Sequence, residues 1–179
     1  RRAHLADVAG AVLEAGPSVM AATRSLEDAG ERVLEAMAER DSFDDELDDA
    51  AQQARAQLAG RSALAAREKP YTLIFDRGIE YYLAAPLGEE KKRYEELSQR
   101  AQENLPADDP VRLAVVAAVG EGVSGFTAAS DKLAKARTDE SLAGTRLDAA
   151  EDAWATLIEK TYGALVERFG RRKADRFFP

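Results

Sequence analysis

A seven-residue repeat of apolar residues near the N-terminus limits the fold of this chain more than any other feature. The repeat places a branched aliphatic residue at every seventh position and an alanine three positions after each: Val12, Val19, Leu26 and Val33, with Ala15, Ala22, Ala29 and Ala36. A helix with this spacing carries a continuous apolar stripe, which it buries against another helix. Because alanine is small, the two backbones can approach closely.

The composition points in the same direction. Alanine supplies 36 of the 179 residues, and it has the highest intrinsic helix propensity of all residues. The sequence therefore predicts an all-α fold, an antiparallel helical bundle of long, alanine-rich coiled-coil helices.

The same repeat returns 100 residues later, which suggests an internal duplication of a helical hairpin unit. Each half also closes with two aromatic residues ahead of a proline. The corresponding residues of the second copy are Val119, Phe126, Leu133, Leu147 and Trp154. Chance alignment of two heptad segments is the alternative. We expect one domain, residues 1–179, with repeat halves 1–86 and 111–179 joined by a polar helix and linker at 87–110.

Local signals predict the helix boundaries of the first half. A helix over about residues 3–39, kinked near Gly16-Pro17, is followed by a second helix that Ser42 caps and that ends before Pro70. The aromatic stretch 71–85 is predicted to be one short buried helix.

Prolines and charges predict the boundaries further along the chain. A polar helix is expected over about residues 88–104, and a new helix is expected to start at Pro110. Residues 111–169 form either one very long helix or a hairpin that turns near Thr138-Asp139. The hairpin is favoured because it would repeat the first half.

Charge and cysteine content exclude several classes of function. The net charge of -8 argues against binding of duplex nucleic acid, which needs a dense basic surface. The absence of cysteine excludes disulfides, thiolate zinc sites and cysteine nucleophiles. The charge is uneven, because residues 41–49 carry six carboxylates while residues 168–176 are strongly basic.

Hydropathy predicts no transmembrane segment, because no apolar run reaches the length that crosses a bilayer. A cytoplasmic location is the default expectation. The sequence does not begin with methionine, so an N-terminal targeting segment outside it stays open.

One glycine motif resembles a phosphate-binding loop. Residues 120–125, Gly-Glu-Gly-Val-Ser-Gly, have the spacing of a dinucleotide-binding fingerprint after an apolar run. That motif requires alternating strands and helices, and only one candidate strand precedes it. The alternative is that these glycines kink a helix or permit close helix contact.

Catalytic and metal sites are not predicted. His4 is the only histidine, which argues against serine triads and against carboxylate-histidine metal pairs in a bundle. No catalytic, cofactor-binding or metal-binding residue is assigned, and no cofactor is expected.

Two segments are candidates for binding. The first is a pocket between helices, which we expect to be lined by Tyr71, Phe75, Asp76, Arg77, Glu80 and Tyr82. The second is a basic and aromatic tail that contacts a partner, a membrane surface or RNA, and its residues are Arg171, Arg172, Lys173, Arg176, Phe177 and Phe178. The alternatives are core packing with an ion pair for the first segment, and phenylalanines folded back onto the bundle for the second.

These features together predict a non-enzymatic structural or protein-protein interaction module with an unidentified protein partner. A homodimer is one form of that partnership. The alternative function is a ligand-sensing or small-molecule-binding helical bundle, with its pocket near residues 71–83.

Overall fold

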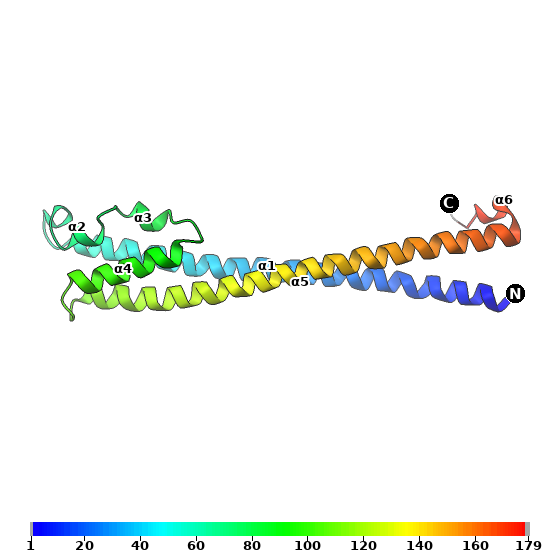
Figure 1. The fold of residues 1–179 in the computed structure, drawn as a ribbon, viewed down its shortest axis with the longest axis horizontal. Coiled ribbons are helices and arrows are strands. Elements are labelled where there is room, and N and C mark those ends of the chain that lie inside the picture. Colours follow the sequence, from blue (N-terminus) through cyan, green and yellow to red (C-terminus); the bar gives the residue numbers. More distant parts are fainter. Residues whose placement is uncertain (1, 178–179) are drawn as a thin grey trace. The chain divides into compact units, whose positions relative to one another are not determined.

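The computed structural model describes residues 2–177, and it describes side chains from residue 10 onward. All regular elements in this range are helical, with no strand, which confirms the all-α prediction (Figure 1). The elements are α1 (Arg2–Ala59), the 3-10 helix η1 (Ala65–Arg67), α2 (Tyr71–Ile74), α3 (Glu80–Leu83), α4 (Glu90–Asn104), α5 (Pro110–Phe169) and α6 (Arg171–Ala174).

Helix α1 is continuous, so the predicted break between residues 39 and 42 is wrong. The helix passes through Pro17, and Ser42 lies inside it rather than at a cap. A cap is worth about 1 kcal/mol, whereas each large apolar side chain buried after the predicted break contributes more. Leu47 and Leu58 are buried beyond residue 42, and Ala36 is buried before it. The apolar stripe therefore outweighs the capping signal.

Helix α5 is also continuous, so the favoured hairpin at Thr138-Asp139 is wrong and the long-helix alternative describes residues 110–169. Neither a glycine nor a proline stands at 138–139 to end the helix, and Ala143 is buried one turn later. The predicted start at Pro110 is confirmed. The Asp109 carboxylate accepts a hydrogen bond of 2.9 Å from the Val111 N–H, and Arg61 lies 2.6 Å away.

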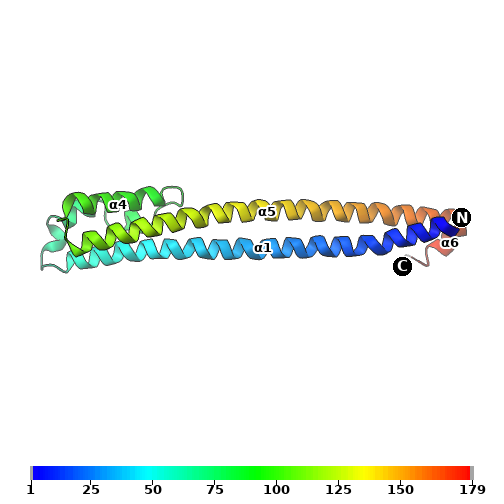
Figure 2. The same ribbon diagram turned by 90° about the horizontal axis from the view of Figure 1, so that it is seen from below.

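The chain divides into two compact units, and α1 and α5 contribute to both. One unit comprises residues 34–134 and holds most of the buried core. In this unit α4 packs with the adjoining parts of α1 and α5 (Figure 2). Its core residues from these three helices include Leu47, Leu58, Tyr94, Leu97, Val115, Val119 and Phe126.

Glycines allow the close approach of helices inside this unit. A Cβ atom built at Gly122 would lie 2.7 Å from Cδ2 of Leu47, closer than real side chains approach. At Gly125 a Cβ would overlap the ring of Phe43. Both glycines therefore leave space for side chains of α1.

The connection between Ala59 and Glu90 differs from the prediction of one buried helix over residues 71–85. It forms the short helices α2 and α3, separated by Gly78 at a φ of 78°. This left-handed conformation favours glycine, and the Gly78 N–H closes the turn after α2 by donating a hydrogen bond of 3.0 Å to the Phe75 carbonyl. The predicted second helix also ends at Ala59 rather than near Pro70. Helix α4 agrees with the predicted polar helix at 88–104.

The other unit comprises residues 1–33 and 135–179, and its described part has a much thinner core. Among residues 10–33 and 135–177, the buried apolar side chains are Ala29, Ala143 and Ala174. Larger apolar residues such as Leu26 and Trp154 are only half-buried. Two helical segments and the short α6 therefore leave much of their apolar surface in contact with solvent.

Part of α5 is long and apolar enough for a membrane span, with a mean hydropathy of 1.4 in its most apolar window. The core helices of soluble proteins also meet this criterion. Val111, Val115, Val119 and Val123 of α5 are buried in the core of residues 34–134.

Candidate functional site

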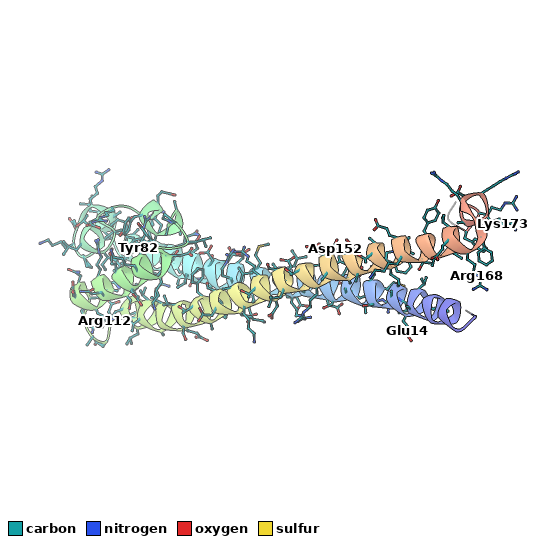
Figure 3. The ribbon with its side chains drawn as sticks, turned by 45° about the vertical axis from the view of Figure 1, so that its right-hand side comes forward. Glu14, Tyr82, Arg112, Asp152, Arg168 and Lys173 are labelled. Atoms are coloured by element: carbon teal, nitrogen blue, oxygen red, sulfur yellow. The ribbon has the colours of Figure 1, made fainter. Side chains whose placement is uncertain are left out.

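The aromatic residues of the predicted pocket lie together as part of the core. The ring centroids of Tyr71 and Phe75 are 5.4 Å apart, and those of Phe75 and Tyr82 are 5.8 Å apart in an edge-on arrangement. The Tyr82 hydroxyl donates a hydrogen bond of 3.0 Å to the Ile74 carbonyl, and burial raises the pKa of Tyr82 to about 12. Tyr82 sits among the crowded side chains of this unit (Figure 3).

The charged residues of that predicted pocket do not join the aromatic ones. Asp76 pairs with Arg100, and the Arg77 guanidinium lies 4.7 Å from the centroid of the Tyr81 ring. Asp76, Arg77 and Glu80 are all exposed. The structure therefore brings the three aromatic residues together and leaves the three charged residues outside them.

The glycine motif at 120–125 lies inside α5. The apolar run before it, residues 113–119, is helical as well. Two of its glycines contact side chains of α1, as described above. This geometry matches the close-contact interpretation of the motif, and it offers no loop of free backbone amides at a helix N-terminus for a phosphate.

A buried carboxyl group on α4 is a feature that the sequence analysis missed. The Glu90 side chain is only 5% exposed, and its Oε2 atom has no hydrogen-bond partner in the described part of the chain. Burial, together with a hydrogen bond to Asp44 and the negative charge of Asp44 and Asp48, raises the pKa of Glu90 to about 8. Arg40 opposes this shift without cancelling it. Burial next to these carboxylates therefore favours the neutral, protonated form of Glu90.

Tyr94, four residues after Glu90 on α4, also contacts the acidic residues of α1. The Tyr94 hydroxyl donates a hydrogen bond to the Asp48 carboxylate, and Tyr94 is completely buried. Burial and this bond raise the pKa of Tyr94, and burial also raises the pKa of Asp48. We call Asp44, Asp48, Glu90 and Tyr94 the carboxyl cluster.

The spacing of these residues is the signal that sequence reasoning overlooked. Asp44 and Asp48 are four residues apart on α1, and Glu90 and Tyr94 are four apart on α4, so each pair shares a helix face. Leu47 and Ala51 on the same stretch of α1 are buried. The acidic run at 41–49 lies inside α1, where Asp41, Asp45 and Asp49 are exposed to solvent and Asp44 and Asp48 are half-buried.

The chemistry available to this cluster is the binding of a proton. Within the described residues, no group of three or more histidine, cysteine, aspartate or glutamate side chains is arranged to hold a metal ion. Glu90 and Asp44 are two carboxyls joined by one hydrogen bond, and burial disfavours two negative charges there. This arrangement therefore favours a protonated carboxyl group at Glu90, between α1 and α4.

An open groove lies between α4 and α5, and none of the four residues of the carboxyl cluster lines it. It has a volume of about 590 Å³ and its polar edge includes Lys91, Glu95 and Asp131. Val119 and Val123 also line it. No residue of the predicted pocket contributes to this groove.

The basic tail forms a short structured segment. Gly170, at a φ of 77°, turns the chain at the end of α5, and α6 follows. Arg171, Arg172, Lys173, Arg176 and Phe177 are exposed, and Phe178 lies outside the described residues. Lys173 projects from α6 near the C-terminal end of the chain (Figure 3).

Comparison with known proteins adds no functional information. The chain matches no protein-family model, no curated protein and no solved structure. Its function has to be inferred from its own geometry.

Proposed function

We propose that the chain is a non-enzymatic structural or protein-interaction module, a helical bundle that binds a helical partner. The partner is a second copy of the chain, and the unit made of residues 1–33 and 135–179 forms the interface.

The observation that carries this proposal is a pair of large exposed apolar side chains on α1. Leu13 is 76% exposed and Met20 is 58% exposed, and they stand seven residues apart. Each lies one position after a half-buried residue of the predicted stripe, Val12 and Val19. A helix with a single packed face carries polar residues at its exposed positions. Leu13 and Met20 are apolar and exposed, so they widen the apolar face of α1 and make it suitable for contact with a further helix.

The thin core of the same unit supports the proposal. In the part of this unit that the structure describes, the buried apolar residues are three alanines, and their small side chains bury little apolar area. Half-buried Leu26 and Trp154 would gain burial from additional helices. A second copy would supply two more helical segments with the same apolar stripe, as in a four-helix arrangement.

Contacts within residues 34–134 support antiparallel pairing of the long helices. Phe43 contacts the site of Gly125, Leu47 contacts that of Gly122, and Glu39 pairs with Lys132. The residue numbers of the contacting positions on α5 therefore decrease as those on α1 increase, which is the order of an antiparallel pair. Internal duplication is part of the same proposal, since each long helix is followed by a short helix and aromatic residues.

Replacement of both exposed residues, Leu13→Glu with Met20→Glu, is expected to convert a dimer into a monomer. Sedimentation equilibrium should give the wild type a mass of about twice the 19.4 kDa of one chain, and the variant the mass of one chain. Each chain would bury two charges without partners in the dimer, four in all, whereas both positions tolerate charge in the monomer.

Leu113→Glu is the matched control, because Leu113 is exposed on α5 within residues 34–134. This variant should remain dimeric. A wild-type chain that is strictly monomeric at high concentration, or a double variant that still dimerises, would contradict the proposal. Unchanged far-UV circular dichroism would show that the helices persist.

A further inference from the structure

The C-terminal helix is held in a fixed position on the end of α5. Ala174 of α6 is completely buried, and the Tyr162 hydroxyl donates a hydrogen bond of 2.6 Å to the Asp175 carboxylate. The turn at Gly170 precedes both contacts. The basic side chains of this segment are therefore displayed from a folded support rather than from a free peptide.

Two exposed aromatic rings stand on this support. Phe169 is 41% exposed and Phe177 is 65% exposed, and both line a shallow hollow of about 220 Å³. The other residues of the hollow are Lys173 and Arg176. Large apolar side chains and cations thus occur on the same surface, which we call the α6 surface.

The charge of the α6 surface is opposite to that of the whole chain. Residues 171–177 carry three arginines and one lysine, all exposed, in a protein with a net charge of -8. Asp175 is the only carboxylate in this segment, and its Oδ1 atom accepts the hydrogen bond from Tyr162. The surface is therefore a concentrated patch of positive charge.

We propose that the α6 surface binds the surface of a membrane that contains anionic lipids. Exposed phenylalanines next to lysines and arginines are the side chains that enter the boundary between headgroups and acyl chains. Each basic residue near an anionic leaflet strengthens binding, and the rings add burial of apolar area. This inference does not depend on self-association of the other helices.

The composition of the surface favours a membrane over an acidic protein or RNA. Residues 168–177 contain no serine, threonine, asparagine or glutamine, so the neutral hydrogen-bonding side chains that accompany arginine in the recognition of proteins or bases are missing. A fluid layer of anionic headgroups needs positive charge without fixed geometry, and the exposed cations beside the two phenylalanines supply it.

Flotation of the full chain with vesicles tests the proposal. Vesicles of about 30% phosphatidylserine in phosphatidylcholine should bind the protein at least about tenfold more tightly than pure phosphatidylcholine. Lys173→Gln with Arg176→Gln should weaken this binding about fivefold for each charge removed. Phe169→Ala with Phe177→Ala should weaken it about tenfold.

Matched controls come from α5 within the same unit. Lys135→Gln with Arg137→Gln removes two exposed cations, and Leu142→Ala removes an exposed apolar side chain. These variants should bind vesicles like the wild type. Because all the substituted side chains are exposed, melting curves should remain superimposable.

Competing ligands separate a membrane from other anions. Inorganic phosphate and glycerophosphoserine at millimolar concentration should not displace the protein from vesicles, and displacement would identify a site for a free phosphate instead. Equal binding to neutral and anionic vesicles, or no effect of either double variant, would overturn the proposal. Stronger retention on polyglutamate or single-stranded RNA than on anionic vesicles would also overturn it.

Discussion

The wild-type protein is expected to lose stability as the pH rises from about 5 to about 8, and the Glu90→Gln variant is expected not to show this loss. The pKa of Glu90 is raised from an ordinary value of 4.5 to about 8 in the folded state. Between these values the unfolded chain releases the proton while the folded chain keeps it. The wild-type free energy of unfolding should therefore fall by up to about 1.4 kcal/mol per pH unit in this window.

The sign follows first from the burial of Glu90, which disfavours its charged form, and then from the groups that surround it. Asp44 and Asp48 face it with negative charge and raise its pKa, while the positive charge of Arg40 lowers it by a smaller amount. Below the ordinary carboxyl pKa both states are protonated, so the stabilisation is complete; above the folded pKa it is lost. Glutamine is neutral at every pH and keeps an N–H donor for Asp44, so the slope should disappear and the variant should be the more stable protein at alkaline pH.

Urea unfolding followed by circular dichroism across this pH range measures the effect. Glu95→Gln is the control, because Glu95 lies on the same helix but is exposed and pairs with Lys91 across 3.9 Å. An exposed ion pair contributes little, so the control should retain the wild-type slope. A wild-type protein whose stability is flat or rises across this range would show that Glu90 is ionised in the fold.

The helical content of this protein was predictable because it depends on local patterns. The heptad spacing of Val12, Val19, Leu26 and Val33 and the abundance of alanine act within single helices, and Asp109-Pro110 marks a helix start in a few residues. The breaks predicted at Ser42 and at Thr138-Asp139 were wrong, because burial of distant residues such as Leu47 and Ala143 decides whether a helix continues. Capping preferences are too weak to compete with that burial.

The carboxyl cluster was not predictable in the same way. Its two halves lie on α1 and α4, and the short helices α2 and α3 stand between them in the chain. Whether Asp44 and Asp48 face water or Glu90 depends on where that connection returns the chain, which no local pattern records. The left-handed Gly78 and the packing of Phe75 on Tyr82 determine part of this path, and neither was identifiable before the structure.

Leu47→Ala is expected to lower the free energy of unfolding by about 2–5 kcal/mol, because Leu47 is 1% exposed and its removal leaves a cavity in the core of residues 34–134. The leucine also fills the space that Gly122 leaves on α5, since a Cβ at residue 122 would lie 2.7 Å from Leu47 Cδ2. The two positions should therefore be coupled in their energies.

A double-mutant cycle measures that coupling. In the wild-type background, Gly122→Ala should lower stability by about 1 kcal/mol, because the clash with Leu47 exceeds the gain in helix propensity. In the Leu47→Ala background the clash is gone, and the same substitution should raise stability by about 1 kcal/mol. Gly120→Ala is the control, since a Cβ there meets nothing within 4 Å, and it should be stabilising in both backgrounds. If Gly122→Ala behaved like Gly120→Ala in the wild type, the two helices would not approach as closely as the structure shows, and the glycines at 120–125 would need a different explanation from helix contact.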